Sequence, residues 1–230
     1  MPTLLVFGAR NIGRVLAREF AADGWRVAAV ALSEETIRRL EDEVPDAVGI
    51  IADAGDRDAV ERVFRDVGDV DLVVNAITVT PAFAGPVHEA PADALDPYVG
   101  KLLPAIFNVL SVGGRVLAER GSGTLVQLTG GSARRGNPDR GPWAAAAFAT
   151  RALLQSQAAE LRPLNVHAAL VIVDAIIESE KTAHWLEDEP PEKSASMEDV
   201  AAAVKYLHRQ SPRGWTHELQ LTPALERWVP

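Results

Sequence analysis

Short runs of apolar residues alternate along this chain with longer stretches in which apolar residues recur every three or four positions. Such runs indicate strands, and such stretches indicate amphipathic helices. The predicted strands span residues 3–7, 26–31, 47–51, 71–75, 124–129, 166–173 and 218–221, and the predicted helices span residues 13–22, 34–43, 56–67, 96–117, 143–161 and 197–209. This alternation predicts an α/β fold with one doubly wound parallel sheet of about seven strands and helices on both faces.

Local signals support several helix starts, and no signal divides the chain. Ser33, Asp56 and Ser196 each precede a predicted helix and supply a side-chain oxygen for its free N–H groups. No linker, repeat or low-complexity tract separates the elements, so we expect a single domain over residues 1–230. Residues from about 178 to 196 are charged and contain two adjacent prolines. They form either a flexible, solvated loop or a lid over a ligand cleft.

Composition and charge argue against several kinds of partner. The chain has 230 residues, of which 47% are hydrophobic, and can bury a large core. Its formal net charge of −9, with no basic cluster larger than Arg134 and Arg135, argues against a nucleic-acid partner. It has no cysteine, and its five histidines show no metal-ligand spacing. We therefore expect neither a disulfide nor a metal site.

We expect no targeting or membrane-spanning segment. The start, Met1 to Phe7, has no basic leader or cleavage region, and the turn at Gly8 follows too early for a secretory signal. We find no uninterrupted apolar run of membrane-spanning length in the sequence. These features predict a cytoplasmic protein without a membrane partner.

Residues 8–13 form a glycine turn between the first predicted strand and the first predicted helix. In this context backbone N–H groups at a helix N-terminus bind a pyrophosphate. Gly8 and Gly13 match the first and third glycines of the GxGxxG fingerprint, but Arg10 replaces the second, which gives the pyrophosphate room. The arginine could instead pair with a ribose 2′-phosphate, and residues 30–33 supply no acid for a free 2′-hydroxyl. NADP is therefore favoured over NAD, while a turn that binds no dinucleotide stays open.

Four segments of the chain resemble, in order and spacing, the anchors of the short-chain dehydrogenase/reductase (SDR) superfamily. They are residues 8–13, residues 51–56, Asn75 with Ala76, and residues 196–201 at the start of the last helix. The resemblance covers nearly the whole chain and implies a Rossmann-type fold. It also implies a cofactor site made of Gly8, Arg10, Asn11, Ile12, Gly13, Asp53, Ala54, Asn75 and Ala76. In this site Asp53 would touch the adenine ring, whereas from the residues alone it could simply cap a loop or helix.

The same resemblance implies a proton relay in which a Tyr, a Lys, a Ser and an Asn act on the substrate. In this chain the corresponding positions hold Trp143, Ala147, Gly130 and Leu102. The indole of Trp143 donates a hydrogen bond but is neither an acid nor a base at neutral pH. The candidate cleft residues are Thr129, Ser132 and Trp143, since both hydroxyls should lie above the carboxyl edge of the sheet. Tyr98 is a weaker surrogate for the acid, and His167 is more typical of a core or strand-end histidine.

The sequence leaves three functions open. The first is an SDR-like protein that binds NADP(H) or a related nucleotide and has lost or strongly altered Tyr/Lys-dependent carbonyl reduction, as a pseudoenzyme would. The second is an atypical NADP-dependent reductase of a small apolar carbonyl-type substrate, in which positioning replaces acid catalysis. The third is a non-redox or cofactor-free enzyme on the same fold. The Ala-rich helix over residues 143–161 is small and apolar on several faces, so we expect a homodimer or homotetramer through it.

Overall fold

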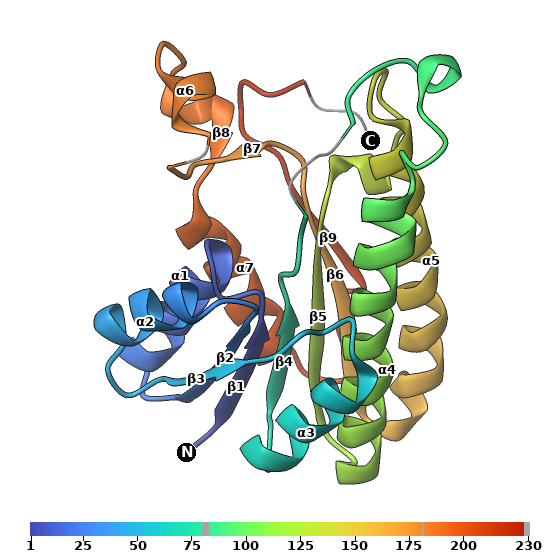
Figure 1. The fold of residues 1–230 in the computed structure, drawn as a ribbon. Helices are drawn as coiled ribbons and strands as arrows, with labels where there is room; N and C mark the ends of the chain where they lie inside the picture. Colours follow the sequence, from blue (N-terminus) through green and yellow to red (C-terminus); the bar gives the residue numbers. More distant parts are fainter. Residues whose placement is uncertain (80–82, 181, 228–230) are drawn as a thin grey trace.

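The structure, a computed structural model, describes residues 1–79, 83–180 and 182–227 (Figure 1). Its centre is a seven-stranded parallel sheet in the order β3-β2-β1-β4-β5-β6-β9, which confirms the predicted fold. The strands are β1 (Thr3–Phe7), β2 (Arg26–Ala31), β3 (Val48–Ile51), β4 (Leu72–Asn75), β5 (Gly123–Gly130), β6 (Val166–Val173) and β9 (Glu218–Leu221). All seven predicted strands are present, and their bounds differ from the prediction by at most one residue.

Helices cover both faces of the sheet and bury two separate cores (Figure 1). One face carries α1 (Ile12–Ala22), α2 (Glu34–Glu43) and α7 (Met197–Arg209), and the other carries α3 (Arg57–Val67), α4 (Leu103–Arg120) and α5 (Gly141–Leu161). Strand β1 serves both cores: Leu5 and Phe7 belong to the core under α3, α4 and α5, and Leu4 and Val6 to the core under α1, α2 and α7. All of β1 is buried, because successive side chains of a central parallel strand point to opposite, covered faces.

The structure confirms the three predicted helix caps. Ser33, Asp56 and Ser196 each accept a hydrogen bond from a backbone N–H two or three residues further along the chain. Each bond satisfies one of the N–H groups that a helix start leaves without a partner. The helices α2 and α7 have their predicted bounds, and α1, α3 and α5 begin within two residues of the predicted starts.

The long helical segment before β5 differs from the prediction in its first turns. Residues Asp96–Leu102 form a π-helix, and α4 follows from Leu103 to Arg120. Pro104 accounts for this difference, because it has no N–H to donate to the carbonyl four residues back. The preceding turn closes instead with the N–H of Leu103 donating to the carbonyl of Tyr98, five residues back.

The same segment bears on the expectation that no uninterrupted apolar run reaches membrane-spanning length. Asp96–Arg120 is long and apolar enough by length and composition, since its most apolar 18 residues have a mean hydropathy of 1.3. In the structure 56% of this 18-residue stretch is buried. Helix α4 packs on β4 and β5 and lies between α3 and α5. A core helix passes the same test of length and composition, so this helix is weak evidence for a membrane span.

Residues 176–195 rise above the carboxyl edge of the sheet as a small unit, which we call the upper unit (Figure 1). Strand β7 (Ile176–Ile177) pairs in parallel with β8 (Ser194–Ala195), and the chain between them contains the short helix α6 (Ala183–Leu186). The hydroxyl of Ser194 donates to Glu178 Oε1 at 2.5 Å and ties the two ends of the unit together. The sequence analysis missed these elements, because strands of two residues leave no periodicity to detect.

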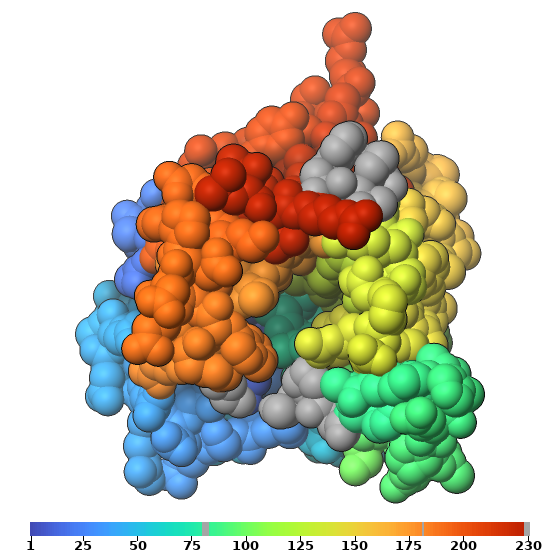
Figure 2. All heavy atoms as spheres, turned by 90° about the horizontal axis from the view of Figure 1, so that it is seen from above, coloured from blue at the N-terminus to red at the C-terminus, as the bar shows by residue number. Residues whose placement is uncertain are grey.

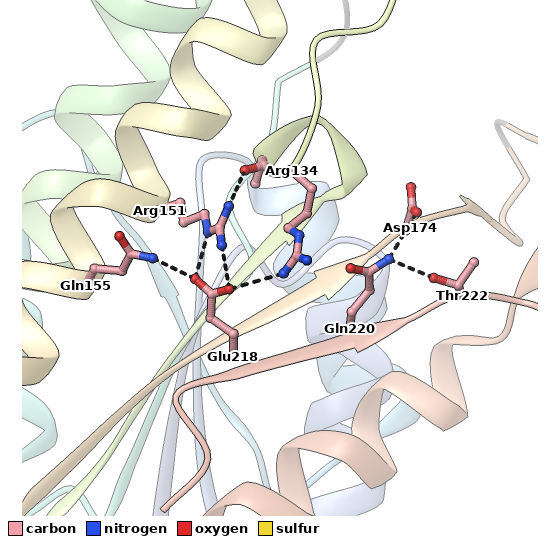
Figure 3. Close-up of polar contacts among 8 residues, drawn as sticks. Arg134, Arg151, Gln155, Asp174, Glu218, Gln220 and Thr222 are labelled. Atoms are coloured by element: carbon pink, nitrogen blue, oxygen red, sulfur yellow. Dashed lines mark hydrogen bonds and ion pairs between the residues drawn. The ribbon is translucent and has the colours of Figure 1, made fainter. Parts of the chain in front are cut away.

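An ion-pair network attaches the edge strand β9 to α5 and to the loop after β5 (Figure 3). Glu218 accepts hydrogen bonds from Arg151 Nε at 2.7 Å, from Arg151 Nη2 at 2.8 Å and from Gln155 Nε2 at 2.9 Å. Arg134 Nη1 lies 3.4 Å from the same carboxylate. Burial by itself raises the pKa of Glu218, but the bonds from Arg151 and Gln155 outweigh this effect and hold the pKa below its ordinary value. The network therefore stabilises the fold when Glu218 is ionised.

Glu218→Gln should lower the free energy of unfolding at pH 7 by about 1–3 kcal/mol, since Arg151 loses its charged partner. The pKa of Glu218 is lower in the folded chain than the unfolded value of about 4.3, so its stabilisation is present above that value and lost as the pH falls through the folded pKa. Urea titrations should therefore show the full difference in the free energy of unfolding between the wild type and Glu218→Gln at pH 7, and a smaller difference below about pH 4. Glu189→Gln removes the same charge from an exposed position; equal losses in both variants would contradict the role of the network.

Candidate functional site

Two connected cavities open at the carboxyl edge of the sheet, where β1, β4, β5 and β6 end. The outer cavity has a volume of about 880 Å³ and the inner cavity about 220 Å³. Seven residues line both: Ile12, Ala76, Ile77, Thr78, Leu102, Ala175 and Ile177. Seen from above, the molecule is hollowed between the upper unit, in orange, and the loop after β5, in yellow-green (Figure 2). Doubly wound sheets bind their ligands at this edge.

The glycine turn lines the outer cavity, and its two glycines have no room for side chains. Gly8 has a φ of +94°, and a Cβ there would lie 2.7 Å from the carbonyl oxygen of Ala76. A Cβ on Gly13 would lie 2.3 Å from the carbonyl oxygen of Gly8. Gly8, Asn11, Ile12 and Ala76 line the cavity, whereas Gly13 does not. Gly13 therefore shapes the turn, and the other four residues face the space that a ligand would fill.

Among the residues that the structure describes, two cations and one carboxylate line the outer cavity: Arg10, Lys101 and Asp53. The Arg10 side chain is exposed and makes no ion pair or hydrogen bond within the part of the chain that the structure describes. The hydroxyls of Ser33 and Thr36, at the end of β2, line the same cavity and lie 2.9 Å from each other. An unpaired guanidinium and two hydroxyls are suitable partners for a phosphate.

Asp53 caps a loop and also faces the outer cavity. Its Oδ1 accepts a hydrogen bond from the N–H of Gly55 at 2.8 Å, and both Asp53 and Ala54 line the cavity. Asn108, which the sequence analysis missed, holds the same loop: its Nδ2 donates to the carbonyls of Ala54 at 2.9 Å and Gly55 at 3.1 Å. A polar residue at a buried position of an apolar helix is the signal that could have revealed it. The capping role of Asp53 is thus present, and its adenine contact stays a prediction.

Asn75 supports the boundary between the cavities and lines neither of them. It is fully buried, and its Nδ2 donates to Gln127 Oε1 at 2.8 Å. Its Oδ1 accepts a hydrogen bond from the N–H of Ile77 at 3.2 Å. These bonds fix the chain after β4, which carries Ala76 and Ile77 to the wall shared by the two cavities.

The four positions that the resemblance assigns to the proton relay converge on the inner cavity. Its lining includes Leu102, Gly130, Trp143 and Ala147. Thr129 lines it as well, whereas Ser132 is buried in the short 3-10 turn Gly131–Ala133 and does not. Thr150, which the sequence analysis missed, also lines the cavity. It lies seven residues after Trp143 on the same face of α5, a spacing that could have revealed it.

Comparison with known proteins identifies the family to which the chain belongs. A family model described as Enoyl-(Acyl carrier protein) reductase matches residues 6–218. The chain belongs to the short-chain dehydrogenase/reductase superfamily. It is 29% identical over 197 residues to L-xylulose reductase of Bos taurus, covering 85% of this chain and 79% of that protein. It is 28% identical over 214 residues to carbonyl reductase (NADPH) 2 of Sus scrofa, covering 88% and 87%.

Solved SDR structures share the fold. The closed form of serine dehydrogenase complexed with NADP⁺ superposes with a TM-score of 0.88 at 16% identity, covering 99% of this chain and 97% of that one. A metagenomic short-chain oxidoreductase in complex with NADP gives a TM-score of 0.80 at 23% identity, covering 98% of each chain. At these identities the similarity establishes the Rossmann-type architecture of the SDR chain.

An aromatic pair fixes Trp143 of this SDR chain. Tyr98 lies in the π-helix before α4 and is only 1% exposed. Its ring meets the indole edge to face, with centroids 5.7 Å apart and an interplanar angle of 89°. Tyr98 itself lines neither cavity. The geometry therefore favours a packing role for Tyr98 over a role as surrogate acid.

A buried ion pair holds the loop after β5 against the end of β6. Asp174 Oδ2 accepts a hydrogen bond from Arg135 Nη1 at 2.9 Å. It accepts a second from Gln220 Nε2 at 3.2 Å (Figure 3). A Cβ on Gly131 would lie 1.8 Å from Asp174 Oδ1, so a side chain at this position would displace the Asp174 carboxylate. Asp174 lies at the carboxyl edge with Asn75 and Thr129, as the predicted fold requires. The sequence analysis did not predict the pair, which joins residues far apart in the chain.

His167 lies at the other end of β6, near the amino edge of the sheet. Its Nε2 lies 2.8 Å from the carbonyl oxygen of Thr216, and its ring stacks on Trp215 with an interplanar angle of 1°. Burial lowers the pKa of His167. These contacts agree with the prediction of a strand-end histidine.

The upper unit forms one wall of the outer cavity. Trp185 of α6 lines it together with Ile176, Ser179 and Thr182. Glu180 of the upper unit also lies 3.7 Å from Arg39 of α2. This position favours the lid interpretation of the segment over that of a solvated loop.

Gly8→Ala should destabilise the protein more than Gly24→Ala does. Both glycines have a positive φ, +94° and +78°, where alanine costs roughly 1–2 kcal/mol of backbone strain. Only at Gly8 does the new Cβ meet backbone atoms closer than 3.0 Å, whereas at Gly24 nothing lies within 4 Å. We expect urea titrations to show that the free energy of unfolding falls by about 1–2 kcal/mol in Gly24→Ala and by about 3 kcal/mol or more in Gly8→Ala. Equal losses would mean that the turn relaxes freely away from Ala76.

Proposed function

We propose that this SDR chain binds NADP(H) in the outer cavity and has lost the Tyr/Lys-dependent carbonyl reduction of its superfamily. One observation carries the proposal: the residues at the four relay positions, Leu102, Gly130, Trp143 and Ala147, all line the inner cavity. None of them titrates near neutral pH. Similarity to NADPH-dependent reductases supports the cofactor, and the four side chains argue against the proton relay.

The outer cavity fits a dinucleotide. Its volume of about 880 Å³ lies within the range of roughly 300–1,000 Å³ that is typical of ligand sites. The turn at Gly8 and the N-terminus of α1 would hold the pyrophosphate. Arg10, with Ser33 and Thr36, would hold the 2′-phosphate, and Asp53 would lie at the adenine. NADPH, when bound, supplies a hydride.

Arg10→Ala should weaken NADPH binding about 10–100-fold and leave NADH binding nearly unchanged, because a hydrogen-bonded charge pair with the 2′-phosphate contributes about 1.5–3 kcal/mol. Isothermal titration with both nucleotides measures this. Arg213→Ala, an exposed arginine that does not line the cavity, is the control. Tighter binding of NADH by the wild type, or an unchanged preference in Arg10→Ala, would refute this cofactor assignment. Binding of neither nucleotide would favour a cofactor-free function.

A second candidate function is that of an atypical NADP-dependent reductase of a small apolar acceptor. The wall shared by the two cavities favours it, since a ligand in the inner cavity lies next to the outer cavity. Most residues that line the inner cavity are apolar. Positioning supplies a large part of a hydride-transfer rate, whereas a positioned acid contributes about 10²–10⁴-fold.

The missing acid can be tested by restoring it. Trp143→Tyr with Ala147→Lys should raise NADPH-dependent reduction of cyclopentanone about 10²–10⁴-fold over Trp143→Phe with Ala147→Lys, which lacks only the hydroxyl. Initial rates of NADPH oxidation give the comparison. If the two double variants have equal rates, the inner cavity is not where carbonyls react. Robust ketone reduction by the unmodified chain would contradict the proposed loss of carbonyl reduction.

We also propose a homodimer or homotetramer that forms through the helix over residues 143–161. Val99, Phe107 and Phe148 are 38%, 48% and 43% exposed on the segment before β5 and on α5. Large apolar side chains on neighbouring helices are suitable for close packing with a second copy. Phe148→Glu should shift the molar mass measured by light scattering at micromolar concentration towards the monomer, while Val48→Glu on the edge strand should not. A monomeric wild type contradicts the proposal.

A further inference from the structure

The described residues that line the inner cavity include no group that exchanges a proton near neutral pH. Its polar lining consists of the hydroxyls of Thr78, Thr129 and Thr150 and the indole of Trp143, and the other lining residues are apolar or glycine. Asp174 is adjacent in sequence to two lining residues but does not line the cavity itself. Its Oδ2 is already bonded by Arg135 and Gln220. Hydroxyl and indole groups form hydrogen bonds at pH 7 without gaining or losing a proton.

This lining favours some hydride acceptors over others, according to the charge that each acquires when it receives the hydride. A hydride added to a neutral carbonyl produces an alkoxide, whose negative charge needs a proton, a cation or strong donors. Within residues 1–79, 83–180 and 182–227, no cationic side chain lines the inner cavity, and Arg10 and Lys101 line only the outer one. A hydride added to an iminium carbon forms a C–H bond, and the C=N π electrons become the lone pair of a neutral amine. That step requires no proton from the protein.

We propose that the inner cavity takes a small cyclic iminium ion and that NADPH reduces it to a secondary amine. This inference rests on the NADP(H) site proposed above. The acceptor brings its own proton on nitrogen, NADPH transfers a hydride to the adjacent carbon, and NADP⁺ and the neutral amine leave. The volume of about 220 Å³ lies below the range of roughly 300–1,000 Å³ for drug-sized ligands. A single ring is therefore the expected size.

The lining offers partners to such a cation. An indole face attracts a cation within about 6 Å more strongly than other aromatic rings do, and Tyr98 fixes the indole of Trp143 by edge-to-face contact. The hydroxyl oxygens of Thr129 and Thr150 are acceptors for the iminium N–H. Because the positive charge disappears during hydride transfer, an apolar cavity destabilises the charged reactant more than the transition state.

The first test compares two acceptors of the same ring size. With NADPH and the wild-type protein, kcat/KM for 2-methyl-1-pyrroline should exceed that for cyclopentanone by at least about 100-fold. This kcat/KM should fall as the pH rises through the pKa of the imine, because kcat/KM reports the ionisation of the free reactants. The midpoint of the fall should therefore be the same in Thr129→Val. Equal rates for both acceptors, or a midpoint that moves in Thr129→Val, overturn the inference.

The second test measures binding without the cofactor. N,N-Dimethylpyrrolidinium, a permanent cation, should bind Ala147→Arg at least tenfold more weakly than Ala147→Met, because both variants introduce a long side chain and only arginine is charged, a charge that it keeps when buried. Isothermal titration gives both affinities, and equal affinities overturn the inference. If Ala147→Arg does not fold, Leu102→Arg against Leu102→Met gives the same comparison on a neighbouring helix.

Titration with NADPH separates this inference from the proposed function. NADPH binding without a preference for the imine overturns the iminium inference and leaves the dinucleotide site standing. Absence of NADPH binding overturns both.

Discussion

Parallel pairing of β1, β4, β5 and β6 brings their carboxyl ends to one edge of the sheet, so the chain segments that leave neighbouring strands cross at very short range. Between β1 and β4 the crossing leaves no room for a Cβ at Gly8 beside Ala76. Between β5 and β6 the space beside Gly131 is filled by the side chain of Asp174. The same crossings form the floor and one wall of the cavities, which makes the sheet register a constraint on the site as well as on the fold.

The side chains at positions 143 and 147 are physically linked. A lysine at 147 would place an ammonium in a cavity whose described lining residues include no carboxylate. An unpaired buried ammonium is strongly disfavoured or loses its proton. Such a charge is useful where it lowers the pKa of a neighbouring tyrosine. With Trp143 in that place there is nothing to activate, and Ala147 removes the buried charge. Trp143 in turn gains an aromatic partner in Tyr98.

The sequence was sufficient for the features that depend on local pattern. The central strands β1, β2, β4, β5 and β6 could be predicted because buried parallel strands are short runs rich in apolar residues. The positions that the resemblance assigns to the relay could be counted because they lie on or beside regular elements at fixed spacing. Contacts between distant segments could not be predicted. Asn108 bonds the loop after β3, and Arg135 pairs with Asp174, and neither partner is marked by sequence spacing. The π-helix depends on Pro104, but a proline in the first turn of a helix is usually tolerated and gave no warning.

Charge is distributed unequally between the two cavities, and this distribution limits the chemistry. A chain with a net charge of −9 binds an anionic dinucleotide only where the local charge is more positive. The outer cavity meets this condition with Arg10 and Lys101 against Asp53. No charged side chain lines the inner cavity among the residues that the structure describes. Negative charge is therefore stabilised where the phosphates would lie, and it has no such partner where an acceptor would react. An acceptor that becomes an anion therefore meets an unfavourable environment as the reaction proceeds, whereas one that loses a positive charge meets a favourable one.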